Sequence, residues 1–66
     1  MKLQFNKKIY LTSTVKKAIK DYSHLADFAL GQDKNYFLVE AANIRPELKN
    51  VFEDEFYNYT LSLTKK

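Results

Sequence analysis

The chain must hold its fold together without a covalent or metal cross-link. It has 66 residues, no cysteine and one histidine, so neither a disulfide nor a zinc site of cysteines and histidines can form. A chain of this length buries only about 60% of its unfolded surface. Five phenylalanines and five tyrosines can make a dense core, because each buried ring removes roughly 150–250 Å² from water. We therefore expect one domain, residues 1–66, built on an aromatic core.

The first third of the chain predicts a strand followed by a helix. Residues 3–11 alternate between apolar and polar side chains, as a half-buried strand does, with a break or bulge expected near Asn6 and Lys7. Residues 12–14 (Thr-Ser-Thr) offer side-chain oxygens for a helix N-cap. Apolar residues at helical spacing then predict a helix of about three turns, ending near residues 23–25. Its apolar face comprises Val15, Ala18, Ile19 and Tyr22.

The remainder predicts a hairpin and a closing helix. Residues 26–30 and 36–41 have strand patterns, and the glycine, aspartate and asparagine between them are typical of a turn. Pro46 suits the first turn of a helix from about residue 43 to Leu63, and Lys65–Lys66 suit the negative end of its dipole. The apolar stripe of this helix comprises Leu48, Val51, Phe52, Phe56, Tyr59 and Leu63.

The order β-α-β-β-α predicts an α+β domain. Because crossover connections in a shared sheet are right-handed, the simplest packing is a three-stranded sheet with the third strand central and two helices packed on one face. If Phe37, Val39 and Ala41 face those helices, then Tyr10, Tyr36 and Leu38 lie on the open face.

No group of residues has the spacing of a catalytic or metal site. His24 lies beside Ser23 and Asp27 at a helix end, without the turn that would present a serine nucleophile to an oxyanion site. Residues 53–55 (Glu-Asp-Glu) point about 100° apart on a helix and do not converge. We predict no catalytic residue, no metal ligand and no cofactor, and thus a binding protein rather than an enzyme.

Glu55 is an anomaly because it falls inside the apolar stripe of the closing helix. A buried carboxylate needs a partner. Lys7, the misplaced lysine of the first strand, is one candidate, and a lysine of a binding partner is another.

Charge is unevenly distributed along the chain, whose net charge is +3. The first 20 residues carry no acid, and all eight acids follow. The exposed lysines form either a solvated surface or an electrostatic face for an acidic partner or nucleic acid. That predicted face comprises Lys8, Lys16, Lys17 and Lys20. Tyrosines on an open sheet could stack bases, but a single arginine and the lack of a matching aromatic motif make nucleic acid the less favoured partner.

Two surfaces are candidates for binding a protein or peptide. Tyr57 and Leu61, one turn apart and flanked by Asn58, form a second apolar edge on the closing helix; the alternatives are ordinary surface, a wider core or a homodimer contact. The open sheet face and the free edge of the first strand could accept an added strand. The predicted partner-binding residues are Tyr57, Leu61, Asn58, Tyr10, Tyr36 and Leu38.

Location is predicted only by default. No stretch approaches the roughly 20 apolar residues of a membrane span. The first residues lack the apolar run of a signal peptide, so we expect a cytoplasmic protein that does not bind membranes.

Two segments resemble a known family. They are residues 5–10 (Phe-Asn-Lys-Lys-Ile-Tyr), leading into the helix of residues 15–23, and residues 55–61 (Glu-Phe-Tyr-Asn-Tyr-Thr-Leu). Together they are similar to HxsD-like proteins, small accessory proteins encoded beside radical-SAM enzymes in His-Xaa-Ser peptide systems. The resemblance implies an accessory role in making a ribosomally synthesised, modified peptide, with a precursor peptide or the modifying enzyme as partner. The iron–sulfur cluster and S-adenosylmethionine would belong to that enzyme.

Overall fold

A computed structural model describes residues 1–64; Lys65 and Lys66, expected at the negative end of the last helix, lie outside the described residues. The elements in chain order are β1 (Lys2–Asn6), α1 (Thr12–Tyr22), β2 (Asp27–Gln32), β3 (Tyr36–Ala42), a short 3-10 helix η1 (Pro46–Leu48) and α2 (Phe52–Thr64). This order confirms the predicted β-α-β-β-α succession and the α+β class.

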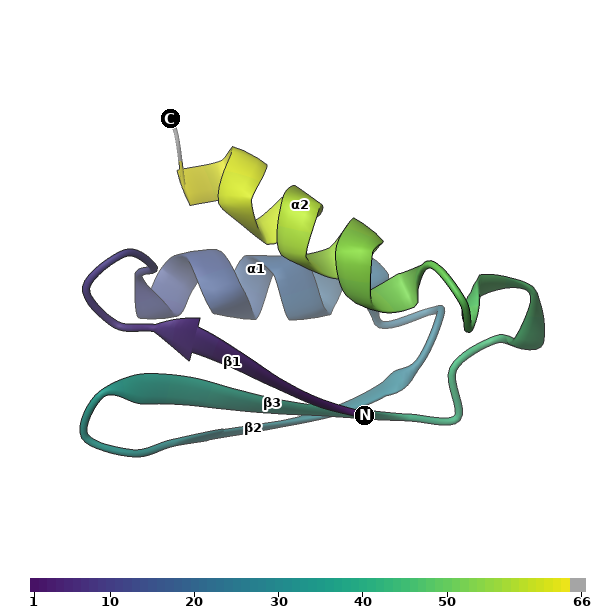
Figure 1. Ribbon diagram of the computed structural model, residues 1–66, viewed down its shortest axis with the longest axis horizontal. Coiled ribbons are helices and arrows are strands. Elements are labelled where there is room, and N and C mark those ends of the chain that lie inside the picture. Colours follow the sequence, from purple (N-terminus) through teal and green to yellow (C-terminus); the bar gives the residue numbers. More distant parts are fainter. Residues whose placement is uncertain (65–66) are drawn as a thin grey trace.

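The three strands form one antiparallel sheet with β3 in the middle. The order is β1-β3-β2, with Leu3 opposite Val39 in one pair and Leu30 opposite Val39 in the other. Both helices lie on the same side of the sheet (Figure 1). The sheet is therefore covered on one face and open on the other, as the sequence predicts.

An aromatic cluster fills the space between the sheet and the helices. Phe37, Val39 and Ala41 are buried on the inner face of β3, as expected. The Phe56 ring lies at the centre, 5.9 Å from the ring of Phe5 and 5.3 Å from that of Phe28. The fully buried phenylalanines are Phe5, Phe52 and Phe56. These rings supply the stability that cross-links would give other small domains.

The strand β1 is shorter than the alternation predicts, because the chain turns after Asn6. The Asn6 carbonyl accepts hydrogen bonds from the N–H groups of Ile9 and Tyr10, and its side-chain Oδ1 accepts one from the Lys8 N–H at 2.8 Å. The break expected near Asn6 and Lys7 is confirmed as the end of the strand. Ile9 and Leu11, expected on the buried side, are 55% and 67% exposed.

The start of α1 differs from the predicted cap. Leu11 occupies the N-cap position and makes no side-chain capping hydrogen bond, while residues 12–14 already lie within the helix. The N-cap prediction is therefore wrong. The apolar face of α1 is confirmed, with Val15 and Ala18 buried and Ile19 and Tyr22 packed against the core.

The predicted closing helix is divided in two. Pro46 begins η1, and α2 starts only at Phe52, so Leu48 and Val51 are not on the helical wheel of α2. The buried face therefore rotates toward Thr60, which is fully buried and donates its hydroxyl hydrogen to the Phe56 carbonyl at 2.8 Å. Val51 is 46% exposed, and Glu55, expected inside the stripe, is exposed to solvent. Within residues 1–64, no helix is both long and apolar enough to cross a membrane.

Candidate functional site

The open face of the sheet carries two of the predicted partner-binding residues. Tyr36 and Leu38 project from β3 away from the helices, opposite Asn6 and Gln4 of β1, and both are half-buried. Leu38 lies in a shallow hollow of about 470 Å³. The outward-facing residues around it are Lys2, Gln4, Ala29, Gly31 and Glu40. The structure thus places an apolar centre between charged and polar side chains on the uncovered face.

Tyr10 does not lie on this face, contrary to the prediction. It follows the turn after Asn6, and its ring packs edge-on against Phe5, with the centroids 5.0 Å apart and the ring planes at 84°. Burial raises the pKa of the Tyr10 hydroxyl, and the nearby Tyr57 raises it further. The sequence alternation continues past the end of the strand, which is why Tyr10 was assigned to the wrong face.

Tyr57 does not point away from the fold either. Its ring centroid is 4.9 Å from that of Phe5, and its hydroxyl oxygen accepts a hydrogen bond from the Gln4 N–H at 3.0 Å. Because the buried face of α2 is rotated toward Thr60, Tyr57 lies at its margin and packs against the core. The geometric basis for a Tyr57–Leu61 outer surface is therefore wrong.

The other two residues predicted on α2 remain at the surface. Asn58 is exposed, and Leu61 is half-buried one turn after Tyr57. Their role in binding a partner stays a prediction, now without Tyr57 as its anchor.

The two edges of the sheet differ in how far the fold occupies them. Met1 and Ala41 exchange two main-chain hydrogen bonds, and the Lys7 N–H bonds the Asn35 carbonyl. Main-chain hydrogen bonding alternates along antiparallel strands, so the N–H and C=O groups of Lys2, Gln4 and Asn6 point outward from the edge of β1. The Gln4 N–H already donates a hydrogen bond to the Tyr57 hydroxyl, and the Asn6 carbonyl already accepts hydrogen bonds within the turn that follows β1. The edge of β1, which the sequence favoured for strand addition, is thus partly closed.

The edge of β2 is open. The Asp33 N–H bonds the Tyr36 carbonyl at 2.9 Å, so alternation turns the main-chain groups of Phe28, Leu30 and Gln32 outward. Among residues 1–64, no element lies beyond β2 in the sheet, and no turn or side-chain hydrogen bond involves these three residues. Leu30 is also 38% exposed. Sequence reasoning missed this edge because the difference between the two edges depends on where α2 docks.

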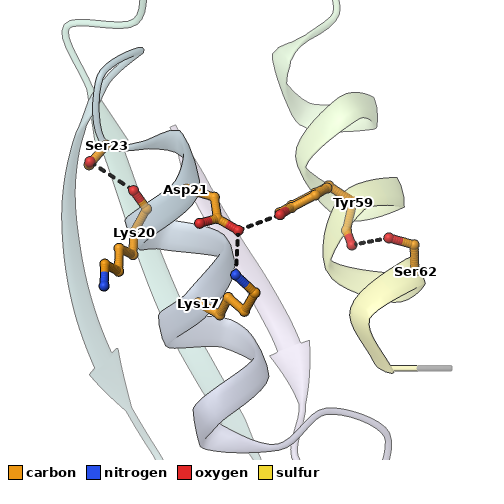
Figure 2. Close-up of polar contacts among 6 residues, drawn as sticks. All are labelled: Lys17, Lys20, Asp21, Ser23, Tyr59 and Ser62. Atoms are coloured by element: carbon orange, nitrogen blue, oxygen red, sulfur yellow. Dashed lines mark hydrogen bonds and ion pairs between the residues drawn. The ribbon is translucent and has the colours of Figure 1, made fainter. Parts of the chain in front are cut away.

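The predicted lysine face does not form one surface, because Lys8 lies in the turn between β1 and α1 and the other three lysines lie on α1. Lys8, Lys16, Lys17 and Lys20 are all exposed, as expected. Lys17 pairs with Asp21 at 3.1 Å on the side that faces α2, whereas Lys20 points away from α2 (Figure 2). In the described part of the chain, neither Lys16 nor Lys20 forms an ion pair.

Asp21 links the two helices. Its carboxylate accepts hydrogen bonds from the Tyr59 hydroxyl and from Lys17 (Figure 2). The Tyr59 hydrogen bond, followed by that of Lys17, lowers the pKa of the Asp21 carboxyl. The same hydrogen bond raises the pKa of the Tyr59 hydroxyl. This contact joins α1 to α2 through Asp21, which is the one acidic residue of α1.

Further lysines gather at the end of the sheet where β1 stops. Lys7, Lys8 and Lys34 line a hollow of about 440 Å³ with Asn6, Asn35 and Tyr36. The Lys7 Nζ donates to the Asp33 carbonyl at 2.5 Å and lies 5.4 Å from the centre of the Phe37 ring. Lys7, one of the two candidate partners for a buried Glu55, is therefore engaged within the hairpin instead, and Glu55 itself is exposed.

The side chains that could act in catalysis or bind a metal ion do not lie close together. His24 is exposed in the turn after α1. Within residues 1–64, no three histidine, aspartate or glutamate side chains are grouped to hold a metal ion. Protein-family models, curated proteins and solved structures show no match to this chain. Arguments about function therefore rest on the surfaces described above.

Proposed function

We propose that this protein is a non-catalytic binding module for a protein or peptide. The observation that supports this best is the sheet face left uncovered by the helices, with Leu38 in a hollow whose lining also includes Lys2, Gln4 and Glu40. An apolar centre within a polar rim is the usual composition of a protein interface. The resemblance to HxsD-like proteins gives the partner a class: a precursor peptide or its radical-SAM enzyme.

Calorimetry with purified components tests this proposal. The protein is titrated with a precursor peptide of a His-Xaa-Ser system and with the radical-SAM enzyme of that system, and binding to one of them is expected. Leu38→Lys should weaken that binding about tenfold or more, because central apolar side chains dominate interface energies. Asn50→Lys, an exposed change in the turn before α2 and away from the proposed binding surfaces, is the matched control. Absence of binding to both components would overturn the proposal, as would turnover of the peptide by the isolated protein.

Nucleic-acid binding is a second candidate, supported by the hollow of Lys7, Lys8 and Lys34 beside Tyr36. Phosphate contacts release counterions, so this function requires an affinity that falls steeply with salt. Unchanged mobility of RNA and DNA at low salt with excess protein would eliminate it. A homodimer, the remaining alternative, is tested by sedimentation over a concentration series.

A further inference from the structure

The open edge of β2 lies beside an unpaired part of the lysine face. Lys16 lines a hollow of about 240 Å³ together with Thr12, Leu30, Gly31, Gln32 and Phe37. Lys20 follows Lys16 by one helical turn on α1 and points away from α2 (Figure 2). Main-chain donors and acceptors, an exposed leucine and two cations thus share one side of the molecule.

From Phe28 to Gln32, the edge of β2 lacks the charged side chains, prolines and bulges that normally prevent strand addition. Proteins protect such edges with prolines, bulges or lysines within the strand. The β2 sequence, Asp-Phe-Ala-Leu-Gly-Gln, contains no proline or lysine, and its pairing with β3 runs without interruption from Asp27 to Gln32. The lysines beside it lie on α1 instead, above the helix-covered side of the sheet.

We propose that β2 pairs with an extended acidic peptide segment, which adds a fourth strand to the sheet. This pairing rests on the proposed binding function and gives the chemistry of the partner. Main-chain hydrogen bonds to Phe28, Leu30 and Gln32 hold the segment. Acidic residues at alternate positions share one face of a strand, so they lie together on the helix-covered side near Lys16 and Lys20.

Charge favours a peptide over a second copy of the chain at this edge. Antiparallel pairing of two β2 strands would bring two copies of α1 to the same junction. The charged side chains of Lys16 and Lys20 in one copy would then lie near those of Lys16 and Lys20 in the other copy, and like charges repel. An acidic segment has the complementary charge.

The test uses a synthetic peptide with blocked ends, six residues long, in which glutamate alternates with valine. Titration into nitrogen-15-labelled protein should shift the amide signals of Phe28, Leu30 and Gln32 and slow their hydrogen exchange. A peptide N-methylated at alternate residues, which cannot donate those hydrogen bonds, should not bind. Lysine in place of glutamate should abolish binding, and added salt should weaken it.

Three protein variants separate the contribution of the lysine charges from that of the main-chain hydrogen bonds. Lys16→Gln and Lys20→Gln should each weaken peptide binding about two- to fivefold, the effect of an exposed ion pair, while Lys17→Gln serves as the matched control. Leu30→Pro removes an outward N–H at a position where an edge strand tolerates proline, and it should abolish pairing. The lysine variants keep the test valid even if Leu30→Pro fails to fold.

Three results would overturn the inference. The first is a peptide that binds nowhere or shifts signals only on β1 or the open sheet face. The second is concentration-dependent broadening of the β2 signals without peptide, which would assign the edge to a second copy. The third is calorimetric binding of the precursor peptide or enzyme that is unaffected by all three β2-side variants. In that last case the proposed function stands and the β2 assignment falls.

Discussion

The hydroxyl oxygen of Tyr57 accepts a hydrogen bond from the main-chain N–H of Gln4, at 3.0 Å, across 53 positions of sequence. This contact joins α2 to the outer edge of β1 and satisfies a donor that would otherwise face solvent or another strand. No comparable contact covers β2 within the described residues. The two edges of the sheet therefore have different capacities to bind a strand.

Tyr57→Phe should release the edge of β1 while keeping the ring against Phe5. The loss of one exposed hydrogen bond is expected to reduce the free energy of unfolding by about 0.5–1.5 kcal/mol. Urea denaturation measures this loss, and hydrogen exchange should accelerate at the Gln4 amide. Tyr36→Phe, on the open sheet face, is the control and should change neither quantity. Unaltered exchange at Gln4 in Tyr57→Phe would contradict the assigned hydrogen bond.

Phe52→Ala should leave the protein largely unfolded. Phe52 is 1% exposed, and its ring stacks on that of Phe56 with centroids 5.8 Å apart. Truncation of such a ring costs about 3–5 kcal/mol, against a total stability of about 5 kcal/mol for a marginally stable small domain. Circular dichroism against temperature measures the outcome.

The matched control is Val51→Ala, one residue earlier and 46% exposed. It should change the free energy of unfolding by no more than about 0.5 kcal/mol. A cooperative melt of Phe52→Ala near the parent temperature would show that the aromatic core does not depend on this ring.

Asn6→Ala tests the turn that ends β1. The Asn6 Oδ1 accepts the Lys8 N–H at 2.8 Å, and the change to alanine removes that acceptor. We expect a loss of about 0.5–1.5 kcal/mol in the free energy of unfolding, measured by urea denaturation. Asn58→Ala, an exposed amide on α2, should be near neutral. Equal effects of the two changes would mean that the turn does not depend on the Asn6 side chain.

Periodicity predicted the elements of the fold, and their order restricted the topology. Residues 36–41 form the most apolar run, and β3 is central because it alone pairs on both sides. The errors arise where a pattern continues past a change of chain direction. Ile9 and Leu11 keep the alternation of β1 after the turn at Asn6, and Leu48 and Val51 keep the spacing of α2 before its first residue. Asn6 itself is a turn-forming residue, so its type was the available signal.

The candidate surfaces were less predictable because they depend on tertiary contacts. The sequence placed Tyr36 and Leu38 correctly on the open face, since their orientation follows from strand alternation alone. The placement of Tyr57 required the rotation of α2, which the helical spacing does not encode. Nor could the difference between the edges of β1 and β2 be inferred, because a side chain of α2 closes one of them.

The contact between Asp21 and Tyr59 predicts two opposite dependences on pH. The pKa of Asp21 is lowered, so its stabilising contribution is present above the ordinary value of 3.8 and is lost as pH falls through the lowered pKa. The pKa of Tyr59 is raised, so its contribution is present below the ordinary value of 10.0 and is lost as pH rises through the raised pKa. One hydrogen bond thus acts at both ends of the pH range.

Tyr59→Phe should remove the Tyr59 effect and reduce the Asp21 effect. The pKa of Asp21, followed by the carbon-13 shift of its carboxyl carbon, should rise toward its ordinary value, although Lys17 still holds it down in part. Lys17→Met is the matched control and should raise the pKa of Asp21 less, because the Tyr59 hydrogen bond is the larger cause of the shift. The titration of Tyr59 must also be followed at that residue alone, because burial raises the pKa values of Tyr10 and Tyr22 in the same direction. An unchanged pKa of Asp21 in Tyr59→Phe would show that the two helices are not joined through this hydrogen bond.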